Sequence, residues 1–123
     1  MSGVETPAAA PAAAWPLDLA FSASARSLAI RFDDGAAFDI PYELLRVESP
    51  SAEVQGHSAA ARQLVRGKEL VGVSGAEPVG RYAVRILFDD GHASGIFTWD
   101  WLYRLGRDRD ALLTDYRARL DLP

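Results

Sequence analysis

The stretch Ile30-Arg31-Phe32-Asp33-Asp34-Gly35 occurs a second time, little changed, as Ile86-Leu87-Phe88-Asp89-Asp90-Gly91. A short apolar run follows each copy, and then comes Tyr42-Glu43-Leu44-Leu45 in the first case and Trp99-Asp100-Trp101-Leu102 in the second. The chain therefore uses one unit of strand, tight turn, strand and helix start twice, with equivalent residues 56 to 57 positions apart. This repeat indicates an architecture and not an activity.

Each copy has the pattern of a β-hairpin. Apolar and polar residues alternate over 27–32, which is typical of a strand with one buried face. Asp-Asp-Gly supplies the turn, because glycine accepts a positive φ and aspartate bonds to nearby backbone amides. The return strand of the first copy covers 36–40, and Pro41 suits the first turn of a helix.

The second half of the chain supplies the remaining predicted elements. Thr98 is a suitable N-cap for a helix, and a last helix beginning at Asp108 or Asp110 has an amphipathic stripe. The prediction is an α+β fold of about five mostly antiparallel strands, with helices on one face. The other elements that we expect are a short helix over 58–67, strands over 69–74 and 81–88, a turn over 75–80 and a return strand over 92–97.

Composition sets the broad class. With 123 residues, 49% hydrophobic and 24% charged, the chain is typical of one globular domain, which we place at 16–123. Residues 1–15 are rich in alanine and proline, and we expect a disordered leader there. The absence of cysteine excludes disulfides and thiolate metal sites and is compatible with the cytoplasm. The net charge of −4 argues against nucleic-acid and membrane partners.

Two kinds of residue could carry chemistry. The paired aspartates are better explained as turn formers than as an acid–base pair, because they occur in both copies. His92 is more informative, since the equivalent residue of the first copy is Ala36. A nucleophilic triad has no supporting motif.

The aromatic segment after Thr98 is a second candidate. Trp99 and Trp101 lie on different faces of a helix, so both cannot easily point into one core. Exposed aromatic side chains beside an arginine are typical of protein-contact hot spots.

From Leu28 to Leu105, the sequence resembles the small domain at the N-terminus of γ-butyrobetaine dioxygenase, which also occurs as stand-alone bacterial proteins of unknown function. The resemblance rests on both Phe-Asp-Asp-Gly turns, on Ser49-Pro50-Ser51-Ala52-Glu53, on Glu77-Pro78-Val79-Gly80-Arg81-Tyr82 and on Ile96-Phe97-Thr98-Trp99. In the dioxygenase, the domain is a zinc-binding accessory module, and the iron-dependent oxygenase chemistry resides in a separate domain.

The resemblance also implies where a metal would bind. Its histidine ligand corresponds to His92, and its three cysteines fall near Ser49, Ser51 and Val54, so a cysteine-ligated site is excluded. The loop that contains these positions should lie close to His92. Similar domains are attached to iron–sulfur carrier proteins, which suggests a link to metal or cluster handling.

We expect a small non-enzymatic interaction module whose partner is another protein. The sequence does not predict its oligomeric state. The residues expected to contact the partner are Ser49, Ser51, His92, Trp99, Trp101, Tyr103 and Arg104.

The alternative is a metal-binding protein that holds iron or zinc through nitrogen and oxygen ligands. The expected ligands are His92, His57, Glu48 and Asp90, with Glu53 and Asp89 as further carboxylates.

Overall fold

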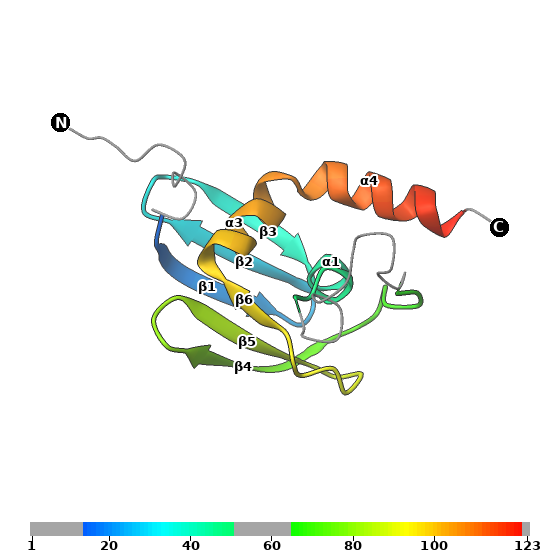
Figure 1. Cartoon of the computed structure of the whole chain (residues 1–123), viewed down its shortest axis with the longest axis horizontal. Helices are drawn as coiled ribbons and strands as arrows, with labels where there is room; N and C mark the ends of the chain where they lie inside the picture. The colour runs from blue at the N-terminus through cyan, green and yellow to red at the C-terminus, as the bar shows by residue number, and fades with distance from the viewer. Residues whose placement is uncertain (1–13, 51–64, 122–123) are drawn as a thin grey trace.

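A computed structural model describes residues 14–50 and 65–121 and confirms the α+β fold (Figure 1). Two similar units follow one another along the chain, and each consists of three antiparallel strands and a helix. A further helix, α4, follows the second unit. The elements are β1 (Pro16–Ser22), β2 (Ser27–Phe32), β3 (Ala37–Pro41), α1 (Tyr42–Val47), β4 (Val73–Val79), β5 (Ala83–Phe88), β6 (Ile96–Thr98), α3 (Trp99–Arg107) and α4 (Arg109–Leu120).

The two units match in detail as well as in outline. The strand orders are β1-β2-β3 and β4-β5-β6. The register shifts between Pro16 and Asp18 in β1 and between Val73 and Gly75 in β4, two irregularities 57 positions apart. The repeat therefore includes the first strand of each unit and its bulge.

The helix of each unit bonds to the turn of the other unit. The Tyr103 hydroxyl in α3 donates to Asp34 Oδ2 at 2.7 Å, and Arg46 Nε in α1 donates to Asp90 Oδ2 at 2.8 Å. Arg46 and Tyr103 are equivalent residues, 57 positions apart. Reciprocal contacts between equivalent residues are what a two-fold relation requires. The two units are thus arranged as two partners in a symmetric pair.

Both units contribute side chains to one buried cluster. Burial of these apolar side chains is the main force that holds the two sheets together. Helix α3 approaches β3 closely at Gly106, where a Cβ atom would lie only 2.4 Å from Cγ of Phe38. The most deeply buried apolar side chains are Leu28, Ile30, Phe32, Ile40, Leu44, Leu45, Ile86, Phe97, Leu102, Leu105 and Tyr116.

Both predicted hairpins and both predicted helix starts are confirmed. Phe32 N donates to the Ala36 carbonyl and Phe88 N to the His92 carbonyl, which closes the two turns. The Thr98 hydroxyl accepts from Trp101 N at 3.1 Å and caps α3. Among the described residues, no helix is long and apolar enough to cross a membrane.

The strands of the second unit correct two predictions. The predicted turn over 75–80 is wrong, because Gly75 and Pro78 lie within β4 and pair with β5. Strand β4 lies at the edge of its sheet, where proline loses no ladder bond and glycine accommodates a bulge. The predicted strand over 69–74 is accordingly wrong for most of its length, since β4 begins at Val73.

The remaining differences lie at the ends of elements. The described part of the chain has six strands, because β1 is not among the predicted ones. The predicted strand over 92–97 shortens to β6, and residues 92–95 are irregular. Ala14 and Trp15 belong to the folded structure, since Ala14 is buried and Trp15 N bonds to Asp33. Most of the predicted leader, and the predicted helix up to residue 64, lie outside the described residues.

Candidate functional site

The second turn gathers two cationic side chains around Asp90. Arg46 Nε lies 2.8 Å and Lys68 Nζ 2.7 Å from Asp90 Oδ2, and the carboxylate also accepts from His92 N at 3.0 Å. Partial burial by itself would raise the pKa of Asp90, but the hydrogen bonds from Lys68, the His92 amide and Arg46 hold it well below its ordinary value. Asp90 is therefore ionised, and its negative charge is paired with Arg46 and Lys68.

His92 lies beside Ser49, which is in the segment that follows α1. Its Nε2 atom is 2.9 Å from Ser49 Oγ, and Ser49 is buried. The expected proximity of this loop and His92 is confirmed at Ser49. A Cβ atom at Gly95 would lie 2.0 Å from Ser49 Oγ, so the backbone of Gly95 closes over the hydroxyl.

The expected metal ligands are only partly brought together. Asp90 and His92 share the second turn, and Glu48 is buried at the end of α1. The described residues contain no group of three or more histidine, cysteine, aspartate or glutamate side chains placed to hold a metal ion. His57, Ser51 and Glu53 lie outside the described residues.

The two tryptophans of α3 are used by the fold. Trp99 Nε1 donates to the Arg81 carbonyl at 2.8 Å, and Trp101 Nε1 donates to the Glu48 carbonyl at 3.1 Å. Both rings are half-buried against the core. The indole N–H groups have partners in different units, but the expectation that both rings could not easily point into one core is wrong, because both pack against the same buried cluster.

Tyr103 and Arg104 differ in their surroundings. The Tyr103 ring packs edge-on against Phe32 and Phe38, at centroid distances of 4.9 and 5.2 Å. Its hydrogen bond to the Asp34 carboxylate raises the pKa of the Tyr103 hydroxyl. Arg104 is exposed, and its guanidinium carbon lies 5.5 Å from the Trp101 ring centroid. Of the expected partner-binding residues in α3, Arg104 is thus the most accessible.

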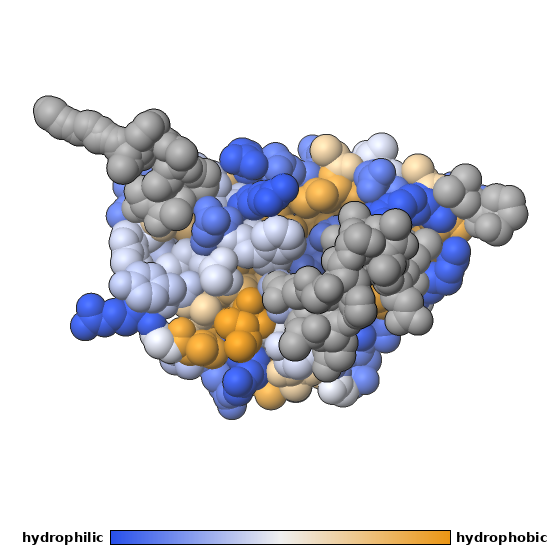
Figure 2. Space-filling model, in the orientation of Figure 1, coloured by the Kyte–Doolittle hydropathy of each residue, from blue (hydrophilic) through white to orange (hydrophobic). Residues whose placement is uncertain are grey.

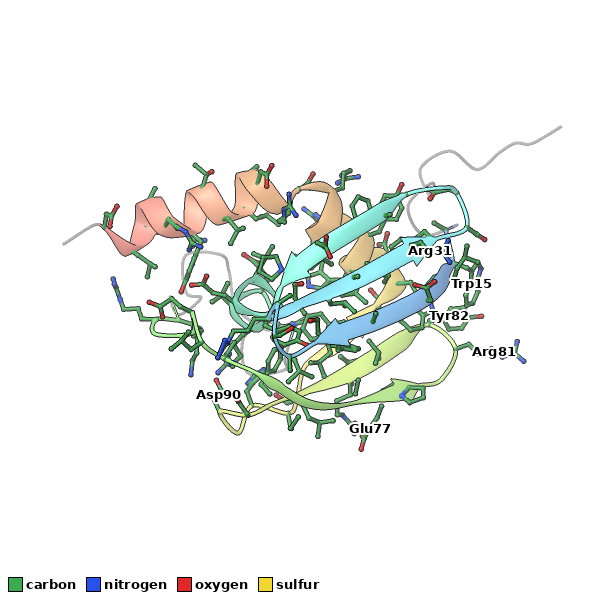
Figure 3. The ribbon with its side chains drawn as sticks, turned by 180° about the vertical axis from the view of Figure 1, so that it is seen from behind. Trp15, Arg31, Glu77, Arg81, Tyr82 and Asp90 are labelled. Carbon is green, nitrogen blue, oxygen red and sulfur yellow. The ribbon has the colours of Figure 1, made fainter. Side chains whose placement is uncertain are left out.

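A second aromatic group was not predicted from the sequence. It consists of Trp15, directly before β1, and Tyr82, in the turn between β4 and β5. Trp15 and Tyr82 are 43% and 65% exposed, and their ring centroids are 5.6 Å apart at an angle of 43°. Arg81 extends from the same turn into solvent, and Figure 3 shows all three side chains at the same end of the molecule. We call Trp15, Arg81 and Tyr82 the aromatic end. Comparison of the two copies could have found it, because the equivalent residues are Gly72, Ala25 and Arg26.

Three other large apolar side chains in the described ranges are exposed. Leu70 is 74% and Leu17 58% exposed, and Ile96 in β6 is 37% exposed. Figure 2 shows an apolar area over β5 and β6. Isolated exposed apolar residues are ordinary features of protein surfaces. The aromatic end differs from them, because two aromatic rings and an arginine occur together.

Known proteins are similar to this chain in sequence and fold. The family model for the gamma-butyrobetaine hydroxylase-like N-terminal domain matches residues 19–103. No curated protein matches the chain.

Three solved structures are similar over most of their lengths. A crystal structure of a DUF971 family protein of unknown function from Acidithiobacillus ferrooxidans is 41% identical, with a TM-score of 0.63 over 74% of this chain and 91% of that chain. A solution structure is 46% identical, with a TM-score of 0.75 over 87% and 84% of the two chains. Another is 41% identical, with a TM-score of 0.78 over 95% and 86%. The chain therefore belongs to the gamma-butyrobetaine hydroxylase-like N-terminal domain family.

Proposed function

We propose that this domain is a non-enzymatic interaction module that contacts another protein through the aromatic end. The observation that carries the proposal is the difference between the two copies. Tyr82 O accepts from the first helical amide of α3, as Arg26 O accepts from that of α1. The equivalents of Trp15 and Tyr82 are Gly72 and Arg26, so the repeat does not require an aromatic side chain at either position. These rings are therefore available for another purpose.

The backbone at Trp15 supports the same argument. Trp15 N donates to Asp33 Oδ1 at 3.1 Å, and Gly72 N donates to Asp89 Oδ1 at 2.9 Å. A glycine thus makes the bonds that the fold needs at this position. Tryptophan, tyrosine and arginine are the residues most enriched in the hot spots of protein interfaces. The composition of the aromatic end suits that role.

The segment of α3 that contains Trp101 and Arg104 stays a predicted contact surface. Arg104 is exposed above the Trp101 ring, while the indole N–H of Trp101 is already bonded to Glu48 O. A partner could use the exposed guanidinium and the open part of the ring. Both surfaces can therefore be tested with one substitution each.

The proposal assigns no catalysis to the Ser49 and His92 pair. A hydroxyl 2.9 Å from an imidazole nitrogen has the spacing of a nucleophile and its base. A substrate carbonyl would also have to reach Ser49 Oγ, which is buried and covered by Gly95. The pair is better explained as a hydrogen bond that fixes the loop to the second turn.

Affinity capture tests the interaction module. Wild-type protein and the Tyr82→Ala and Trp101→Ala variants are immobilised and exposed to an extract of the cells that make the protein. We expect one or more bound proteins to be lost with Tyr82→Ala while thermal unfolding shows that the variant remains folded. Identical profiles for wild type and Tyr82→Ala would refute the assignment to the aromatic end. Loss with folded Trp101→Ala alone would transfer the function to α3.

Metal binding is the second candidate, and the contact between Ser49 and His92 favours it. This contact joins two of the positions that the family resemblance associates with zinc ligands. Iron or zinc would be held by His92 with carboxylate or further histidine ligands, because the chain has no cysteine. Elemental analysis of purified protein tests this function. A stoichiometric metal that is lost in His92→Ala would support it, and a substoichiometric metal content that His92→Ala leaves unchanged would exclude it.

A further inference from the structure

We infer that the aromatic end binds a proline-rich segment of a partner protein, in the extended polyproline II conformation and with an acidic residue next to the prolines. This inference rests on the proposed function and adds the chemistry of the partner. It is carried by the two exposed rings, by their polar atoms and by the charge beside them.

The two rings offer the aromatic contact surface that a proline-rich segment uses. The rings of Trp15 and Tyr82 have centroids 5.6 Å apart and planes inclined at 43°, and each ring keeps a substantial part of its surface exposed. Aromatic-lined surfaces of this kind bind proline rings by apolar contact. Proline also loses little conformational freedom on binding, because its φ angle is already fixed.

The polar atoms of the same rings select an extended ligand. Within the described residues, neither the Trp15 indole N–H nor the Tyr82 hydroxyl makes a hydrogen bond, whereas the indoles of Trp99 and Trp101 both donate to carbonyls. A polyproline II segment has no internal hydrogen bonds, so its carbonyls are free to accept from such donors. The two rings can therefore hold a backbone as well as proline side chains.

An added β-strand is a poorer occupant at this position. Strand addition needs unpaired backbone groups along a sheet edge. At Trp15 the N–H already donates to Asp33 Oδ1, and the carbonyl already accepts from Asp33 N at 2.8 Å. Recognition by the side chains of Trp15 and Tyr82 avoids this competition.

The positive charge of Arg81 determines which type of residue is expected next to the prolines of the ligand. Arg81 makes no ion pair with any residue in the described ranges, and it extends into solvent beside Tyr82 (Figure 3). Arg31 also lies at this end but is bonded to Asp18 at 2.6 Å. A basic segment would be repelled by Arg81, whereas a carboxylate could pair with it. The ligand is therefore expected to be acidic.

Nuclear magnetic resonance of the ¹⁵N-labelled full chain tests the inference. The probe is a synthetic peptide of prolines and alanines that ends in a glutamate. We expect the indole N–H signal of Trp15, assigned with Trp15→Phe, to move on titration, while the signal of Trp101 stays in place. Tyr82→Ala should weaken the affinity about tenfold or more, and Leu70→Ala, at another exposed apolar residue, should leave it unchanged.

Charge reversal supplies the matched control. Arg81→Glu should weaken binding of the glutamate peptide and strengthen binding of the same peptide with lysine in place of glutamate. The inference fails if the Trp15 signal does not move, or if a glycine–serine peptide with the same glutamate binds equally well. It also fails if the wild-type protein forms a dimer that Tyr82→Ala abolishes, because the occupant is then a second copy. If Tyr82→Ala loses a captured protein but the wild-type chain does not bind the peptide, the proposed interaction module is still supported. Only the inference of a proline-rich partner is then refuted.

Discussion

Replacing Asp90 by asparagine should show how differently the two equivalent turns are stabilised. Asparagine keeps an oxygen that can accept from the His92 amide, but it removes the negative charge that Arg46 and Lys68 share. The side chains of Asp90, Arg46 and Lys68 are only 18%, 15% and 23% exposed, so water replaces the lost partner poorly. The substitution therefore leaves two largely covered cations without their anion.

The size of the effect follows from the bond to Arg46. Lys68 has a flexible stem and can turn toward water, so we count one charge-assisted hydrogen bond as fully lost. Such a bond contributes about 1.5–3 kcal/mol, which gives an expected decrease of about 2 kcal/mol in the free energy of unfolding. For a domain of this size, the melting temperature should fall by on the order of 10 °C.

Urea unfolding of wild type, Asp90→Asn and Asp34→Asn measures the difference. Asp34 is the equivalent residue, but its partner in α3 is the neutral Tyr103 hydroxyl and not a pair of largely covered cations. We expect a clearly smaller loss for Asp34→Asn than for Asp90→Asn, with the same dependence on urea concentration. Equal losses at the two turns would refute the reasoning from burial and charge.

Acid should reduce the difference in the free energy of unfolding between wild type and Asp90→Asn. The pKa of Asp90 is lower in the folded protein than its unfolded value of about 3.9. A lowered folded pKa gives stability that is fully present above the unfolded pKa and is lost as the pH falls through the folded pKa. The difference between wild type and Asp90→Asn should thus be constant near pH 7 and shrink below about pH 4. A difference that stays unchanged in strong acid would contradict the ion-pair explanation.

Two further predictions concern close approaches of the backbone. Gly106→Ala should destabilise the protein by about 1–3 kcal/mol, because the new Cβ would lie 2.4 Å from Phe38. Gly75→Ala should destabilise it much less, because the new Cβ would lie 3.5 Å from its nearest neighbour. Thermal unfolding compares the two, and equal stability would contradict the packing. Gly95→Ala should displace the Ser49 hydroxyl from His92 and change the imidazole signals in a proton spectrum, and unchanged signals would show that this contact is loose.

Much of the fold was predictable because its causes are local. The alternation of apolar residues in β2 and the Asp-Asp-Gly turns depend only on neighbours in the chain. The capping of α3 by Thr98 is equally local. Strand β4 was missed because Gly75 and Pro78 normally interrupt a strand, and only the position of β4 at a sheet edge removes that penalty.

The candidate site was predicted less well, because exposure depends on the whole molecule. Trp99 and Trp101 read as possible contact residues, but their indole N–H groups bond to Arg81 O and Glu48 O. Those carbonyls are 18 and 53 positions away in the chain. Trp15 and Tyr82 looked unremarkable in the sequence, although their separation of 67 positions closes to 5.6 Å between rings in the structure.

The sequence by itself determined that one unit is used twice, because each copy carries its own periodicity and turn residues. Only the tertiary structure decided that α1 bonds to the second turn and α3 to the first, through Arg46 with Asp90 and Tyr103 with Asp34. The same arrangement leaves the rings of Trp15 and Tyr82 exposed at one end. The physical reason is that a turn or a strand is selected by adjacent residues, whereas burial and partner choice depend on which distant surfaces pack together.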